Sequence, residues 1–225
     1  MLTVKDLKKD QEIQELLRVT EIELEVLGFT EHSNRHVSIV SKWAGDILRE
    51  LGGTEREIRQ AEIAGYLHDI GNAINRLDHA QSGALLAYHI LTSRGESYTD
   101  AAEVMLAIGN HDESNGEPVS RVTAALIIAD KADVHKSRVR RMTADGVLRN
   151  PYQDIHDRVN MAAESSFLEV DNEKKTITLN ITIDTEICSV MDYFEIYIKR
   201  MSLCKKAANF LGCHFSLRIN NTQLL

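Results

Sequence analysis

The clearest hydrophobic pattern lies in residues 31–51, where apolar side chains recur at intervals of three and four. This spacing is typical of an amphipathic helix with one buried face. The imidazole of His36 falls on the same stripe as the apolar side chains. The pattern therefore predicts a helix that carries a metal-capable group into the core.

Helices are also predicted on both sides of this segment. Residues 3–28 carry a helical pattern rich in Leu, Ile and Glu, and Thr54-Glu55-Arg56-Glu57 is a capping box that begins another helix. That helix runs to the sequence AGYLHDIGN, where His68 and Asp69 end an apolar run. A buried imidazole and carboxylate need polar or metal partners, because burying them alone costs several kcal/mol.

Three more helices are expected in the same half of the chain. Asp78 has the character of an N-cap for a helix whose first turn holds His79. Residues 99–111 form the next predicted helix, with His111 on its apolar face, and a later helix places Asp130 on its own apolar face. Each of these helices therefore also directs a metal-capable group toward the core.

The pattern changes near Ser165, where alternation replaces helical spacing. The sequences SFLEV, DNEKK and TITLNITID indicate strand, turn and strand, residues 187–211 return to a helical pattern, and HFSLRI indicates a last strand. The sequence thus predicts a mainly α protein. It has a helical bundle domain over residues 1–163 and a small α+β appendage, in the order β-β-α-β, over residues 164–225.

Composition narrows the class of protein. The chain has 225 residues, of which 43% are hydrophobic, and no apolar run approaches the ~18 residues of a membrane span. The N-terminus lacks the apolar core of a signal peptide, and three cysteines without a CxxC pair indicate reduced thiols. The formal charge of −8 argues against a nucleic acid polymer as partner. We expect a cytoplasmic protein with no membrane partner.

Six metal-capable groups fall on the predicted buried faces: His36, His68, Asp69, His79, His111 and Asp130. The intervals between them cross helix boundaries, so the groups come from different helices and meet at one point in a bundle. Four imidazoles and two carboxylates suit iron, manganese or another first-row ion better than a structural zinc site. His32 lies on the same stripe as His36 and remains the alternative first ligand.

This order of groups resembles the H…HD…H…H…D pattern of the HD-domain superfamily, most of whose members are metal-dependent phosphohydrolases with a helical fold. The resemblance covers roughly residues 30–140. The added His79 and His111 resemble its two-metal branch. Asn72 stands where many relatives carry a Lys that often meets the substrate, and the Gly-Tyr-Pro motif of one phosphodiesterase branch is absent.

The resemblance implies a ligand set for two divalent ions, iron or manganese. The first ion would be held by His36, His68, Asp69 and Asp130, and the second by His79, His111 and the bridging Asp69. It also implies a phosphohydrolase that acts on a nucleotide or another phosphate ester or anhydride through a metal-bridging hydroxide, with Asp69 and His68 as the catalytic pair. The rival functions are a di-iron oxygenase with the same ligands and a metal-loaded signalling or interaction module without catalysis.

The substrate is expected to be small, phosphorylated and nucleotide-like. The run KSRVRR, residues 136–141, is the densest basic segment of the chain. Arg138 and Arg140 of this run, together with Lys131 beside Asp130, are the predicted phosphate contacts, with a solvated face as the alternative. Edge strands of the appendage are of the kind through which chains pair, so a homodimer is also considered.

Overall fold

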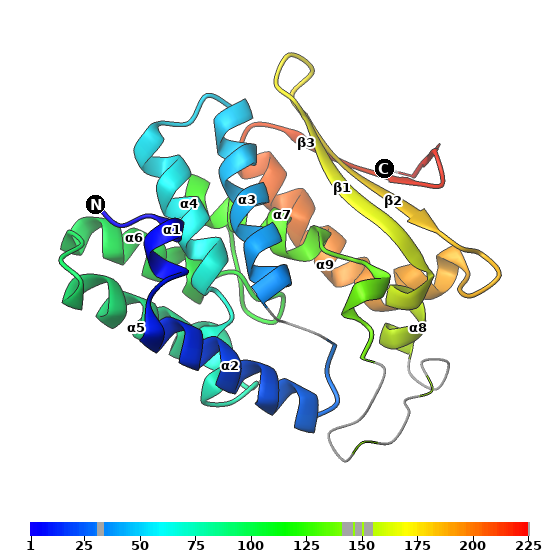
Figure 1. The fold of residues 1–225 in the computed structure, drawn as a ribbon. Coiled ribbons are helices and arrows are strands. Elements are labelled where there is room, and N and C mark those ends of the chain that lie inside the picture. Colours follow the sequence, from blue (N-terminus) through cyan, green and yellow to red (C-terminus); the bar gives the residue numbers. More distant parts are fainter. Residues whose placement is uncertain (31–33, 141–145, 147–149, 151–154, 225) are drawn as a thin grey trace.

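The computed structural model describes residues 1–30, 34–140, 146, 150 and 155–224. The helices are α1 (Val4–Leu7), α2 (Gln11–Val26), α3 (Asn34–Glu50), α4 (Glu55–Leu67), α5 (His79–Ser93), α6 (Tyr98–Gly109), α7 (Arg121–Ala132), α8 (Ile155–Ala162) and α9 (Val190–Phe210), with 3-10 turns η1 (Ile70–Ala73) and η2 (Lys136–Arg138). The strands are β1 (Ala163–Asp171), β2 (Thr176–Ile183), β3 (His214–Ile219) and β4 (Thr222–Gln223). Figure 1 shows a helical bundle with a small sheet beside it, so the predicted fold class is confirmed.

Helix α7 lies at the centre of the bundle. Its residues 122–129 are all buried, and it contacts α3, α4, α6 and α9. A helix that is apolar on every side needs neighbours on every side. The exceptions on α7 are Arg121, its first residue, and half-buried Asp130, near its C-terminal end. The most buried helix of the fold therefore ends next to the metal-capable groups.

Two glycines let the elements around the doublet of His68 and Asp69 approach closely. A Cβ atom on Gly65 of α4 would lie 2.7 Å from the backbone of Ser41 on α3. A Cβ atom on Gly71 of η1 would lie 2.0 Å from the carbonyl oxygen of His79 at the start of α5. Because only glycine fits at such distances, these two positions set how close α3 and α5 come to the doublet.

The four strands form one sheet in the order β1-β2-β3-β4. Strands β1 and β2 are antiparallel, β2 and β3 are parallel, and β3 and β4 are antiparallel. The parallel pair requires a crossover, which α9 supplies. Helix α9 contacts both β2 and β3, and it also packs on α7. The predicted β-β-α-β order is therefore observed, with the two-residue β4 added.

Three local expectations differ from the structure. The N-terminal helical pattern is split, because Asp10 accepts hydrogen bonds from the backbone of Glu12 and Ile13 and caps a second helix there. Asp78 precedes α5, but with φ at 57° its side chain makes no capping bond. His111 lies two residues beyond the end of α6 rather than on its face. At Asp10 and before His111, a turn interrupts the chain where the spacing of apolar residues alone predicts a continuous helix. At Asp78 the helix begins as predicted, but without the predicted cap.

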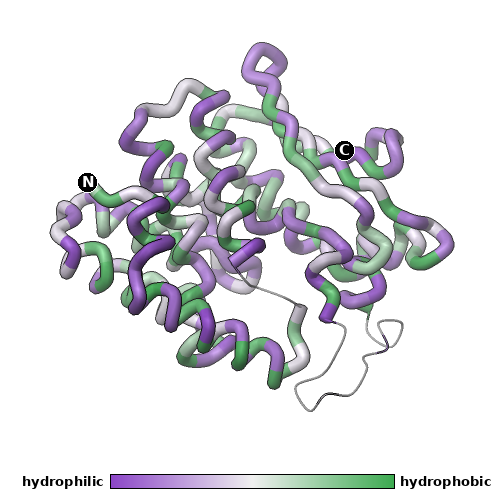
Figure 2. The backbone as a smooth tube through the Cα atoms, viewed as in Figure 1, coloured by the Kyte–Doolittle hydropathy of each residue, from purple (hydrophilic) through white to green (hydrophobic). Residues whose placement is uncertain are grey.

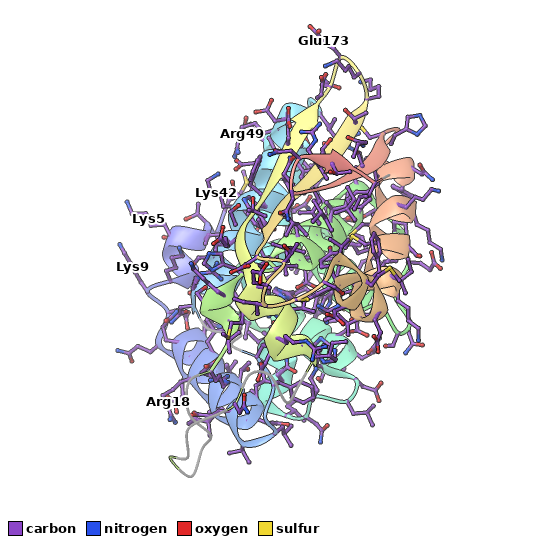
Figure 3. All side chains as sticks on the ribbon, turned by 90° about the vertical axis from the view of Figure 1, so that its right-hand side faces the viewer. Lys5, Lys9, Arg18, Lys42, Arg49 and Glu173 are labelled. Atoms are coloured by element: carbon purple, nitrogen blue, oxygen red, sulfur yellow. The ribbon has the colours of Figure 1, made fainter. Side chains whose placement is uncertain are left out.

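Many charged side chains lie on the outside of this fold, apart from those buried around the metal-capable groups. In Figure 3, Lys42 and Arg49 point outward from α3, and Glu173 stands at the tip of the turn between β1 and β2. In Figure 2, hydrophilic and hydrophobic stretches alternate along α2, as its amphipathic pattern requires. Within the described ranges, no helix combines the length and apolarity needed to cross a membrane.

Candidate metal centre

The structure brings the six predicted ligands together from separate elements. They are His36 of α3, His68 and Asp69 after α4, His79 at the start of α5, His111 after α6 and Asp130 of α7. All are buried apart from half-buried Asp130. The alternative ligand, His32, lies outside the described residues. Polar groups that are far apart in sequence thus share one small interior region.

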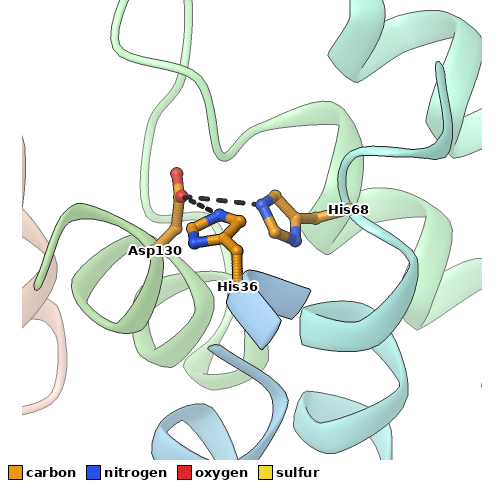
Figure 4. Close-up of side chains that lie close together, drawn as sticks. All are labelled: His36, His68 and Asp130. Carbon is orange, nitrogen blue, oxygen red and sulfur yellow. Dashed lines mark ion pairs between the residues drawn. The ribbon is translucent and has the colours of Figure 1, made fainter. Parts of the chain in front are cut away.

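His36, His68 and Asp130 form the first group. Their potential ligand atoms all lie within 4.8 Å of one another. The Oδ1 atom of Asp130 is 3.4 Å from the Nε2 atom of His36 and 3.5 Å from the Nε2 atom of His68. Figure 4 shows both imidazoles directed at this carboxylate. We call these three residues the inner group.

Asp69 joins the inner group to the remaining histidines. Its Oδ2 atom lies 3.2 Å from the Nε2 atom of His68, and its Oδ1 atom lies 3.7 Å from the Nε2 atom of His79. His68, Asp69 and His111 also place ligand atoms within 4.8 Å of one another. We call His79 and His111 the outer pair. The two oxygens of one carboxylate therefore face the two groups.

Each of the four imidazoles is held by its Nδ1 atom. The Nδ1 contacts are His36 to Asp133 Oδ2 at 2.8 Å, His68 to Gly65 O at 2.9 Å, His79 to Arg76 O at 3.2 Å and His111 to Ile108 O at 2.6 Å. A carbonyl or carboxylate oxygen only accepts, so the Nδ1 atom donates the proton in each case. The Nε2 lone pair is then free to coordinate, which is the arrangement of metal-binding histidines.

The charge around His68 favours a cation. Burial lowers the pKa of His68, but Asp69 and Asp130 raise it more, to about 10. Among the described residues, its buried Nε2 atom has no hydrogen-bond partner. By contrast, burial and the neighbouring His68 and Lys131 lower the pKa of His111 to about 3, which keeps that imidazole neutral. A pKa raised in this way means that His68 holds a proton in the metal-free site, and a divalent ion bound between the carboxylates and the imidazoles would take the place of that proton. Imidazole and carboxylate side chains are donors that first-row divalent ions accept, so the residues fit such an ion.

A second layer of side chains holds the ligands in place. Asp133, which accepts from His36, also receives the guanidinium of Arg35 at 3.1 Å. Burial raises the pKa of Asp133, but the contacts with His36 and Arg138 lower it well below its usual range. Asn72 is fully buried and donates to Asp69 Oδ1 at 2.9 Å. Asn72 therefore orients the carboxylate that lies between the two groups.

The centre lies against a cavity of about 320 Å³. Lys131 and Arg138, two of the three predicted phosphate contacts, line this cavity. Arg140 does not line it. Its side chain donates instead to the carbonyl of Phe29 and to Glu21, at 2.9 and 2.6 Å. The basic run is therefore divided between the cavity and a contact with the N-terminal segment.

The sequence patterns missed several residues of this cavity. Asp112 and Glu113 follow His111 directly, and the Oδ2 atom of Asp112 lies 3.8 Å from the Nε2 atom of His79. Both carboxylates directly follow a predicted metal ligand in the sequence HDES, and this position could have indicated that they lie near the centre. Tyr197 and Arg200 come from α9, where no sequence feature indicated a site. The appendage therefore supplies part of the cavity wall.

Comparison with known families gives one match that covers the centre. Residues 31–137 match the HD domain family. The matched segment contains all six predicted ligands. It excludes the sheet together with α8 and α9.

The chain is also similar to individual proteins. An uncharacterized protein of Methanocaldococcus jannaschii is 26% identical over 205 residues, which cover 80% of this chain and 76% of that protein. Ribonuclease Y of Lawsonia intracellularis is 32% identical over 109 residues, which cover 47% of this chain but only 18% of the ribonuclease. A crystal structure of a predicted HD superfamily hydrolase from an uncultured Thermotogales bacterium has a TM-score of 0.44 and 25% identity, covering 60% of this chain and 75% of that one.

Proposed function

Residues 31–137 belong to the HD-domain family, and from this membership and the geometry of the centre we propose that the protein is a metal-dependent phosphohydrolase. Its substrate is a nucleotide or another small phosphate ester or anhydride. The observation that carries the proposal is the common orientation of the four imidazoles. Each is fixed at Nδ1 and directs Nε2 toward the carboxylates of Asp69 and Asp130.

The proposed ligands form two sets. The inner group with Asp69 would hold one divalent ion, and the outer pair with Asp69 would hold the other. Iron and manganese suit imidazole and carboxylate donors. Bound there, they would supply Lewis-acid chemistry and would lower the pKa of a coordinated water toward neutrality.

The protein's own side chains prepare the site for an anionic substrate. Asn72 and His68 hold the Asp69 carboxylate between the two sets, as the contacts at 2.9 and 3.2 Å indicate. Lys131 donates to Asp130 at 2.5 Å and brings a positive charge to the cavity wall. The cavity volume of about 320 Å³ is at the small end of the range for ligand pockets, which suits a compact substrate.

The test uses protein reconstituted with manganese under strict exclusion of oxygen. We expect release of phosphate or a phosphomonoester from a panel of nucleotides and dinucleoside polyphosphates, with heavy oxygen from labelled water in the phosphoryl product. A short RNA belongs in the panel because one relative is named a ribonuclease. Activity that requires iron and dioxygen, and that places oxygen from dioxygen in the product, would replace the hydrolase with an oxygenase.

A further inference from the structure

One carboxylate at the cavity wall holds two cations from distant parts of the chain. The Oε2 atom of Glu113 is 2.8 Å from Lys131 Nζ, and its Oε1 atom is 2.8 Å from Arg200 Nε. With one cation on each of its oxygens, Glu113 is placed as an ionised carboxylate. All three residues line the cavity beside the metal centre.

The guanidinium of Arg200 is fixed in position but has donors to spare. Its Cζ atom lies 4.9 Å from the centre of the Tyr197 ring, and the hydroxyl of Tyr197 accepts from Asn160 at 3.3 Å. In the described part of the chain, the hydrogen bond of Arg200 uses Nε and leaves both terminal nitrogens available. A guanidinium that lies over an aromatic ring and has both terminal nitrogens available is well suited to bind two oxygens of one phosphate.

The charge of the cavity points to the same class of ligand. Among its described lining residues are the carboxylates Asp69, Asp112, Glu113, Asp130 and Asp157 and the cations Arg76, Lys131, Arg138 and Arg200. These charges leave the lining with one excess negative charge. Two divalent ions change that balance to three positive charges. The metal-loaded cavity is therefore suited to a polyanion rather than to a neutral substrate.

We propose that Arg200, supported by Tyr197 and paired with Glu113, forms a phosphate-binding subsite that the appendage adds to the HD domain. The subsite binds a phosphate group of the substrate through the terminal nitrogens of Arg200, while Glu113 limits the affinity by its own negative charge. This assignment rests on the proposed function only for the identity of the anion as a phosphate.

A second ion pair on α9 provides a control that distinguishes phosphate binding by Arg200 from a purely structural contact between α9 and the loop after α6. Lys206 of α9 contacts Glu117, so it connects α9 to the same loop that Arg200 reaches through Glu113. Both side chains of this second pair are more than half exposed, and neither residue lines the cavity. Lys206 is therefore a matched control, because its removal also breaks a link between α9 and the loop.

The experiment measures binding of inorganic phosphate to the full chain loaded with manganese, by titration calorimetry. We expect Arg200→Met to weaken phosphate binding by about tenfold, since a hydrogen bond to a charged group is lost. Glu113→Gln should strengthen it severalfold, because a repelling charge is removed. Lys206→Met should leave it unchanged. Bound manganese per chain is measured for every variant and should equal that of wild type.

Several results would overturn the subsite. Unchanged phosphate binding in Arg200→Met, or binding that falls equally in Lys206→Met, would show that Arg200 is only a support. Weaker binding that accompanies loss of manganese would assign the phosphate to the ions alone. If Arg200→Met does not fold, Arg200→Lys replaces it and should still bind more weakly. Because binding is measured without turnover, failure of the proposed hydrolase leaves this result interpretable.

Discussion

The inner group and the outer pair of the metal centre are built from different kinds of structure. Two of the three residues of the inner group, His36 and Asp130, lie within α3 and α7, whereas His68 follows the last residue of α4. His79 and His111 lie at the boundaries of helices, and both line the cavity. Side chains inside packed helices are held by many contacts, whereas helix ends are more easily displaced. We therefore expect the inner group, with two of its three residues inside helices, to be the more rigid of the two.

Their supporting contacts differ in the same direction. The Nδ1 atom of His36 donates to the carboxylate of Asp133, whereas those of His68, His79 and His111 donate to neutral backbone carbonyls, so a carboxylate supports one imidazole of the inner group and neither imidazole of the outer pair. A carboxylate partner makes the imidazole a more basic metal ligand than a carbonyl partner does. We therefore expect an ion in the inner group to bind more tightly and to exchange more slowly than an ion at the outer pair.

The largest effect is expected from removing the residue that both sets share. Asp69→Ala should reduce bound metal from about two ions per chain to nearly none and abolish hydrolysis, since the bridging carboxylate serves both ions. Elemental analysis of protein purified without chelator measures this. Asp46→Ala is the control, because that carboxylate lies on the exposed side of α3. A full metal complement in Asp69→Ala would refute a shared ligand.

Removing one member of the outer pair should separate the two sets. His79→Ala should lower bound metal from about two ions to about one, with the remaining ion in the inner group. His89→Ala is the matched control, because it changes an exposed imidazole on the same helix. The same elemental analysis serves. If His79→Ala still holds as much metal as His89→Ala, the outer pair binds no ion of its own.

A milder change tests the supporting layer of the inner group. Asp133→Asn keeps the side-chain size but removes the charge that His36 contacts at 2.8 Å. Loss of such a partner weakens metal affinity by roughly 10–100-fold. Competition with a metal chelator should show this loss for the tighter ion only. A loss confined to the weaker ion would reverse the comparison.

The smallest effect is expected at Asp112, beside the outer pair. Its Oδ2 atom lies 3.8 Å from His79 Nε2, and its side chain is 19% exposed. Asp112→Asn should weaken the second ion severalfold, because one negative charge near that ion is lost. The first ion should be unaffected in the same chelator competition. Glu117→Gln, in the same loop, is the control. Equal affinities in both variants would exclude a role for Asp112.

Much of this arrangement was predictable because it depends on local sequence. The spacing of apolar residues in 34–50 gives a helix with His36 on its buried side, and the capping box at Thr54 begins α4. The strand alternation after residue 163 is equally local, and its antiparallel hairpin follows from a short turn. The predicted resemblance to the HD-domain family was confirmed for residues 31–137, which match that family. The domain boundary, the two-ion ligand set, the cytoplasmic location and the homodimer stay predictions.

Other features were decided by tertiary structure. Glu113 and Arg200 are 87 positions apart, and they meet because α9 packs on α7. Arg138 and Arg140 are two positions apart, yet one lines the cavity and the other donates to Phe29. Periodicity records which side of a helix is apolar, but it carries no information about which element covers that side. The sequence therefore determined the metal-capable groups, and the packing of α9 determined what surrounds them.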